Sequence, residues 1–230
     1  MAALAVGCAG GPADMSASPA AAPIHPACAQ ADVSGGLCIV ILGDSIGVGA
    51  PLTGDDRWWP QLRGLLEVAL PGRTIAIDNW AVSGSQVDLL ESSAAQPAIA
   101  SYDLAIVLEG VNDVRVATPI DAWRSRYEAA VARIESQGTT VILATPPPEV
   151  SNGSFDTRFD PLAAAIRAVA ATNRSLVDLS ARWRADGATA ATTYYVDEIH
   201  QGPAGQAVMA MLTRDVVLEA LKRQPTPSSG

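Results

Sequence analysis

Five short apolar runs, separated by stretches of helical spacing, constrain the fold of this chain more than any other feature. The runs cover residues 38–42, 74–78, 103–108, 139–144 and 175–179. The stretches expected to be helices cover residues 57–70, 119–137, 160–172 and 203–222. Strands that alternate with helices predict a parallel sheet covered on both faces, because each helix must cross over the sheet to reach the next strand. We therefore expect an α/β fold with about five parallel strands.

Proline and glycine mark the ends of the expected helices. Pro119 lies near the start of one segment, and Gly138 follows its end. In the next helix we expect Asp160 to be the N-cap residue and the following proline to occupy the first helical position. Pro203 opens the last helix. These signals agree with helices between the strands.

The two ends of the chain differ in composition from the part between them. Residues 1–36 are mostly Ala, Gly, Pro and Ser, which is typical of a linker, and residues 224–230 are expected to be a disordered tail. We expect the folded domain over residues 37–223. The start, MAALAVGC, is similar to the end of a bacterial lipoprotein signal, with small residues before Cys8, although it lacks a basic n-region and its apolar stretch is short. Cys8 is the candidate lipid anchor, and the protein is then expected to be secreted or attached to the cell envelope.

The other two cysteines allow two interpretations. If the protein is exported, Cys28 and Cys38 can form a disulfide that ties the first segment to the first strand. Such a bridge would contribute roughly 2–3 kcal/mol by restricting the unfolded chain. Alternatively, Cys38 is a small buried core residue.

Charge and composition exclude several classes of function. The formal net charge is −9, and Lys222 is the only lysine among the 230 residues. Without clustered cations, nucleic acid is not an expected partner. A nucleotide-binding P-loop needs a lysine after its glycines, and none is present there. The cysteines and histidines form no metal-ligand pattern, so we expect no metal site. No segment is apolar enough to span a membrane, so we expect no transmembrane helix.

Polar motifs follow the apolar runs, at the edge where parallel sheets bind ligands. These motifs are GDS at residues 43–45, NWAVSG at 79–84, EGVND at 109–113 and TPPPE at 145–149. A serine nucleophile needs a base, and the base needs an orienting group. His25 lies in the low-complexity segment, so His200 is the candidate base for Ser45, with Asp197 as its partner. Taken alone, DEIH at 197–200 is better explained as a polar loop before a helix, because this pattern arises easily by chance.

Acyl transfer also needs donors for an oxyanion. The candidates are the backbone N–H groups of Ser45 and Gly84 and the side-chain amide of Asn112. Gly84 is a candidate because glycine allows a close backbone approach. Each motif is also compatible with an ordinary turn.

The four motifs, in this order, resemble the sequence blocks of the SGNH hydrolase family, also called GDSL esterases and lipases. The matching residues are Gly43-Asp44-Ser45, Gly84, Gly110-Val111-Asn112-Asp113 and Asp197-Glu198-Ile199-His200. The resemblance spans residues 38–222, with Ile46 where the family usually has Leu and Gln201 where it usually has Pro or Leu.

The resemblance implies a flavodoxin-like three-layer α/β/α fold and hydrolysis of small or medium acyl esters through an acyl-enzyme, without a cofactor. Ser45 would attack, His200 would act as base and then acid, and Asp197 would orient it. Ser45, Gly84 and Asn112 would hold the oxyanion. The family also suggests a monomer.

Alternatives to simple ester hydrolysis remain at the sequence level. The same site could remove acyl groups from cell-envelope glycans or transfer them, and a third hypothesis is an inactive surface lipoprotein that binds a ligand. Trp58 and Trp59 could line an acyl or sugar pocket, or simply belong to the core. We expect Asp44 and Asp113 to be structural acids in turns rather than members of the triad.

Overall fold

The computed structural model describes residues 36–223 and contains a five-stranded parallel sheet. Its strands are β1 (Leu37–Gly43), β2 (Ile75–Asn79), β3 (Leu104–Leu108), β4 (Thr140–Thr145) and β7 (Ser175–Asp178). Their order in the sheet is β2-β1-β3-β4-β7. This is the flavodoxin-like order, in which the chain moves to opposite sides after β1 and leaves a crevice between the carboxyl ends of β1 and β3.

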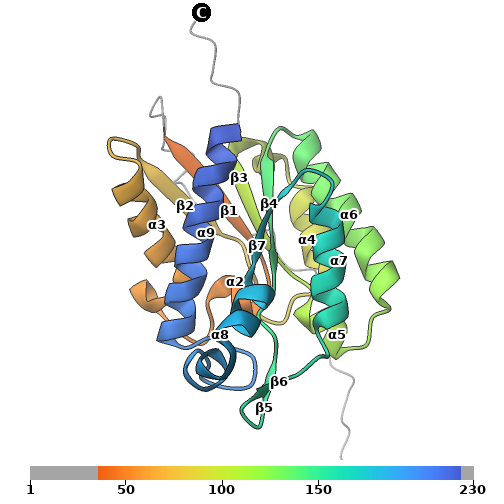
Figure 1. The fold of residues 1–230 in the computed structure, drawn as a ribbon. Helices are drawn as coiled ribbons and strands as arrows, with labels where there is room; N and C mark the ends of the chain where they lie inside the picture. The colour runs from red at the N-terminus through yellow and green to blue at the C-terminus, as the bar shows by residue number, and fades with distance from the viewer. Residues whose placement is uncertain (1–35, 224–230) are drawn as a thin grey trace, which may run out of the picture.

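Helices cover both faces of the sheet and form a three-layer α/β/α sandwich (Figure 1). The helices on one face are α3 (Trp58–Ala69) and α9 (Pro203–Arg223), and those on the other are α4 (Val87–Ala94), α6 (Ile120–Ser136) and α7 (Asp160–Ala170). Further elements lie at the carboxyl ends of the strands, and these are α2 (Ser45–Val48), η1 (Gly54–Asp56), α5 (Val111–Arg115), α8 (Leu179–Thr193) and a hairpin of β5 (Val150–Ser151) and β6 (Ser154–Phe155). The short η2 (Pro97–Ser101) precedes β3 at the amino end of the sheet.

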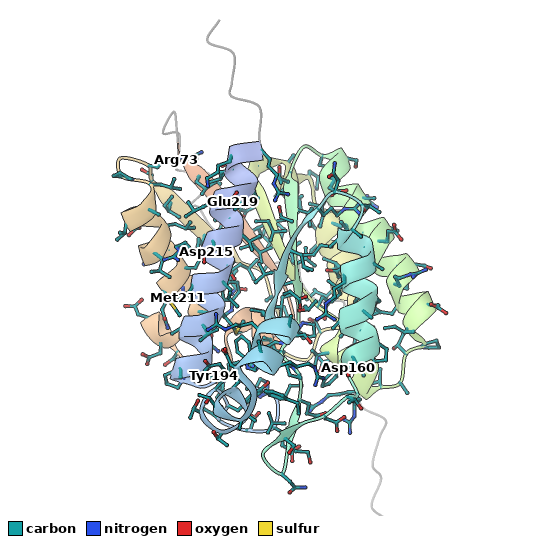
Figure 2. All side chains as sticks on the ribbon, in the orientation of Figure 1. Arg73, Asp160, Tyr194, Met211, Asp215 and Glu219 are labelled. Carbon is teal, nitrogen blue, oxygen red and sulfur yellow. The ribbon has the colours of Figure 1, made fainter. Side chains whose placement is uncertain are left out.

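The central strands are buried because both faces of the sheet are covered. All residues of β1 and β3 are buried; β1 is apolar up to its final Gly43, and β3 is apolar throughout. The covering helices carry apolar side chains on one stripe, such as Trp58, Leu62 and Leu66 in α3. Side chains fill the space between these layers (Figure 2). This close packing holds the end of each strand in place, and so fixes the position of the residue that follows it.

The structure confirms the fold class and corrects details of the helices. The sequence pattern missed α4, α5 and α8, which are short or have little amphipathic periodicity. Asp160 is also not the N-cap of α7: the helix begins at Asp160, Phe159 precedes it, and the Asp160 carboxylate pairs with Arg184. Figure 2 labels Asp160 at this end of α7. The ion pair with a residue 24 positions away replaced the local capping bond.

Candidate active site

The nucleophile candidate stands on a tight turn between β1 and α2. Gly43 has φ +150°, and a Cβ at this position would lie 1.9 Å from the carbonyl oxygen of Leu108 on β3. Only glycine therefore allows β1 to pass so close to β3 at this point. Asp44 is the N-cap of α2, and its carboxylate accepts a 2.9 Å hydrogen bond from the Ile46 N–H. Ser45 is the first residue of α2 and is partly exposed.

The structure brings together the three residues of the predicted triad. His200 Nε2 lies 2.9 Å from Ser45 Oγ, and His200 Nδ1 lies 2.8 Å from Asp197 Oδ2. The serine and the histidine are 155 positions apart in sequence, so only the tertiary fold creates this contact. A serine hydroxyl, an imidazole and a carboxylate in this chain of hydrogen bonds can activate the hydroxyl as a nucleophile.

Asp197 is held in place as a charged carboxylate. Its Oδ1 accepts hydrogen bonds from the N–H groups of Ile199 (2.8 Å) and His200 (2.7 Å). Burial alone would raise the pKa of Asp197, but these two bonds and the His200 side chain together lower the pKa below its ordinary value. The Asp197 side chain is 50% exposed, so water also stabilises its charge. The loop thus presents a fixed negative charge to the imidazole.

Two loops bring further donors to the same edge. Gly84 lies in the loop after β2 with φ +85°, and nothing lies within 4 Å of where a Cβ would stand. The left-handed conformation favours glycine at this position, and the space beside it is open. Within residues 36–223, the N–H groups of Ser45 and Gly84 donate to no protein acceptor. Asn112, in α5, donates from Nδ2 to the carbonyl oxygen of Ser85 at 2.8 Å.

Three buried acids, Asp44, Glu109 and Asp113, lie in the nucleophile turn or in the segment that follows β3. Burial, more than any other cause, raises the pKa of Asp44 to about 6 and that of Glu109 to about 9. It also raises the pKa of Asp113, whose carboxylate accepts a 3.1 Å bond from the Val87 N–H at the start of α4. Asp44 and Asp113 therefore hold backbone turns together, and neither contacts Ser45 Oγ or His200 in the way that Asp197 does.

A buried polar link connects the serine turn to the histidine loop from behind. The Trp58 indole donates to the carbonyl oxygens of Ile46 and Gly47, both at 3.1 Å. The Trp58 N–H donates to Gln206 Oε1, and Gln206 Nε2 donates to the Gln201 carbonyl oxygen. Trp58 is 1% exposed, so it is a core residue and does not line a substrate pocket.

Some sequence predictions fall outside this geometry. Cys8, Cys28 and His25 lie outside the described residues, so the lipid anchor and the Cys28–Cys38 disulfide stay predictions; Cys38 itself is buried in β1. Across residues 36–223 the structure contains no helix long and apolar enough to cross a membrane, and no cluster of metal-ligating side chains.

Sequence reasoning missed Glu109 and Ser85 as members of the site. Glu109 lies inside the motif EGVND at 109–113, and Ser85 directly follows the motif NWAVSG at 79–84. The available signal was a glutamate that directly continues the buried strand LAIVL, because a carboxyl group at such a position needs a specific partner.

The fold and the residues at its carboxyl edge define a class of hydrolase. The sequence pattern of the GDSL-like lipase/acylhydrolase family matches residues 41–208, and the chain belongs to this family. No curated protein matches the chain in sequence.

Solved structures with the same fold include a lipase/acylhydrolase from Enterococcus faecalis, which is 22% identical, with a TM-score of 0.69 over 83% of this chain and 100% of the other. An acetyl xylan esterase, AlAXEase, is 18% identical, with a TM-score of 0.65 over 80% of this chain and 100% of the other. The psychrotrophic esterase EstA from Pseudoalteromonas sp. is also 18% identical, with a TM-score of 0.65 over 81% of this chain and 99% of the other. These likenesses concern the fold.

Proposed function

We propose that the protein is a serine esterase that hydrolyses small or medium acyl esters through an acyl-enzyme. The observation that carries this proposal is the 2.9 Å distance between Ser45 Oγ and His200 Nε2, together with the 2.8 Å contact from His200 Nδ1 to Asp197. Family membership gives independent support for a hydrolase.

In this mechanism Ser45 Oγ attacks the ester carbonyl carbon, and His200 Nε2 accepts the hydroxyl proton. The tetrahedral intermediate then collapses, His200 donates the proton to the leaving alcohol, and the acyl group stays on Ser45. Water repeats the sequence, with His200 again as base, and releases the carboxylic acid. Asp197 orients the imidazole and stabilises its positive charge in both steps.

The oxyanion is proposed to bind between the N–H groups of Ser45 and Gly84 and the side chain of Asn112. The first two N–H groups have no protein acceptor within the described chain. An asparagine amide has two N–H donors, and Ser85 uses one of them, so the second is available for a substrate oxygen. Donors of this kind contribute about 3–4 kcal/mol each to the lowering of the barrier.

Exposed valines favour an apolar acyl chain. Val82, Val116 and Val196 are 47%, 59% and 49% exposed. Val82 and Val196 lie in the loops that carry Gly84 and Asp197, and Val116 directly follows α5, the helix that carries Asn112. Exposed apolar side chains around a polar site supply contacts to an alkyl chain.

Removal of acetyl groups from a glycan is the second candidate. It is supported by the fold shared with an acetyl xylan esterase, and the same Ser45 chemistry would apply. Comparison of p-nitrophenyl butyrate with acetylated xylo-oligosaccharides separates the two, because only the second candidate predicts faster deacetylation of the sugar. Sugar acceptors added to the ester assay, with acylated product detected by mass spectrometry, would reveal transferase activity.

The triad is tested by Ser45→Ala and His200→Ala, assayed with p-nitrophenyl acetate and butyrate. Each variant is expected to lose at least about a thousandfold in kcat, because the nucleophile and its base act as one unit. Ser92→Ala, on the exposed side of α4, is the matched control. Equal turnover by the wild type and both triad variants would remove the assignment. Labelling of Ser45 by a fluorophosphonate probe excludes an inactive ligand-binding protein.

A further inference from the structure

Glu109 occupies an unusual position for an acidic residue. It directly follows the buried strand β3, is 1% exposed, and forms no ion pair with an arginine, lysine or histidine of the described chain. Its Oε1 accepts a 3.0 Å hydrogen bond from the Gly110 N–H. Its Oε2 lies 2.9 Å from Ser85 Oγ. The carboxyl group therefore lies between the loop that carries Gly84 and the start of α5, the helix that carries Asn112.

The hydrogen bonds around Ser85 determine where the proton of this acid lies. Ser85 Oγ is 3.1 Å from the Gly43 carbonyl oxygen, which can only accept a hydrogen bond. The single hydroxyl proton of Ser85 cannot serve both Gly43 and Glu109 Oε2. If Ser85 donates to Gly43, then the short contact with Glu109 requires a proton on Oε2. All three contacts are satisfied together when Glu109 is a neutral acid that donates to Ser85.

Ser85 is linked to each of the three segments that supply the proposed oxyanion donors. Its hydroxyl group bonds to Gly43, two residues before Ser45. Its carbonyl oxygen accepts the bond from Asn112 Nδ2. Its backbone directly follows Gly84, and its N–H closes the loop by a 3.0 Å bond to the Val82 carbonyl oxygen. A shift of Ser85 would therefore move two or more of the donors together.

We propose that Glu109 is a positioning residue that, as a neutral acid donating to Ser85, fixes the Gly84–Ser85 loop and Asn112 against the nucleophile turn. The inference rests on the proposed esterase function for its catalytic consequence. Its structural part, the protonated carboxyl group and its bond to Ser85, stands independently of which ester is cleaved.

The groups facing Glu109 favour the neutral form. Burial is the main cause that raises its pKa to about 9, and the negative charges of Asp44 and Asp113 raise it further. Tyr127, from α6, is buried; burial first, and then the charge of Glu109, raises the pKa of its phenol, so this neighbour stays neutral and supplies no positive charge that would stabilise an ionised Glu109. Above pH 9, ionised Glu109 would compete with Gly43 for the Ser85 proton and loosen the loop.

The test compares Glu109→Gln with Glu109→Leu and measures kcat and KM for p-nitrophenyl butyrate from pH 6 to 10. Glutamine keeps one acceptor and one donor at the same places, so near pH 7.5 its kcat is expected within about threefold of the wild type. Leucine removes both, and kcat is expected to fall roughly 10- to 100-fold with KM nearly unchanged, as for misplaced catalytic groups. The wild type should lose kcat above about pH 9, and Glu109→Gln should not. Glu67→Gln, on the exposed face of α3, is the control.

Ser85→Ala provides a second variant if Glu109→Leu does not fold. It removes the hydroxyl group that links Glu109 to Gly43 but keeps Glu109 itself. The same fall in kcat at constant KM is expected. The inference is overturned if folded Glu109→Gln is as impaired as Glu109→Leu or Ser85→Ala, or if it keeps the alkaline loss of the wild type.

A readout without catalysis separates this inference from the proposed function. An infrared band of a protonated carboxylic acid is expected at pH 7.5 in the wild type, lost on titration through about pH 9 and absent in Glu109→Gln. Its absence from the wild type overturns the inference even if the protein is a fully active esterase. Its presence in a protein without ester activity would support the protonated acid and count against the esterase proposal alone.

Discussion

Asp197 and Glu109 are carboxylic acids in the same site, but their surroundings shift their pKa values in opposite directions. Asp197 lies in the exposed loop that carries His200, and Glu109 is buried at the end of β3. Asp197 is half exposed, accepts two backbone N–H bonds and faces an imidazole, and its pKa lies below its ordinary value. Glu109 is buried beside other acids, and its pKa is raised to about 9. The environment, and not the type of side chain, therefore assigns the charge.

The difference shows how one site obtains both an anion and a neutral donor from the same functional group. A catalytic histidine that becomes positively charged needs a permanent negative partner. A loop of oxyanion donors needs the opposite, because a negative charge beside it would repel the developing oxyanion. The two acids serve these needs only if their pKa values stay apart, which the following experiments test.

The largest effect is expected when the anion is removed. In Asp197→Asn the amide oxygen can still accept the bonds from Ile199 and His200, so the loop should keep its shape. The amide cannot stabilise a charged imidazole, and kcat for p-nitrophenyl butyrate at pH 8 is expected to fall about 10³- to 10⁴-fold. Glu198→Gln, its exposed neighbour, is the control. A loss of less than tenfold in Asp197→Asn would contradict the role of this charge.

The pH dependence of stability should differ in sign between the two acids. Unfolded Glu109 ionises near its ordinary pKa of 4.5, whereas the folded protein keeps the proton up to about pH 9. Between these values the folded state binds more protons, so this group makes the unfolding free energy fall as pH rises. Glu109→Gln should therefore gain stability over the wild type progressively from about pH 5 to pH 9, measured by urea unfolding.

Asp197 supplies the opposite case in the same experiment. Its folded pKa is lowered, so its contribution to stability is present above its ordinary pKa of 3.8 and is lost as pH falls below that value. Asp197→Asn should be slightly less stable than the wild type at pH 7 and equal to it in strong acid. If the difference in unfolding free energy from the wild type changed with pH in the same direction for both variants, the two environments would not shift the two pKa values apart.

The smallest effect on activity is expected from substitution of the exposed valines near the proposed site residues. Val82→Ser, Val116→Ser and Val196→Ser should each lower kcat/KM for p-nitrophenyl octanoate about threefold, because each removes partly exposed apolar surface. Activity on the acetate should hardly change. Val68→Ser, near the end of α3, is the control. An equal loss on both esters would contradict an acyl-binding role.

Periodicity in the sequence was sufficient to predict most of the architecture. The five strand positions and helices α3, α6, α7 and α9 were predicted within a few residues, because long apolar runs and stripes are local signals. Short α4 and α5 and the weakly amphipathic α8 were not predicted. Their formation depends on contacts with the rest of the domain, which a local pattern does not contain.

The site residues could be predicted where the side chain itself is a typical catalytic group. Ser45, His200 and Asp197 were candidates from residue type, motif order and the scarcity of histidine. Glu109 and Ser85 were not, because the role of each arises from a contact with the other across 24 positions. Gly84 was a candidate from its motif, and the structure adds that its left-handed conformation favours glycine.

The sequence by itself determined which groups this protein can use: a hydroxyl after the first strand, one imidazole before the last helix, and a carboxylate three residues away from it. It also determined the parallel sheet, because the spacing of apolar residues is set by strand and helix geometry. Only the tertiary structure decided the distances between these groups and the charge of each acid. Both depend on burial and on partners that are distant in the chain, and neither quantity exists before the core is packed.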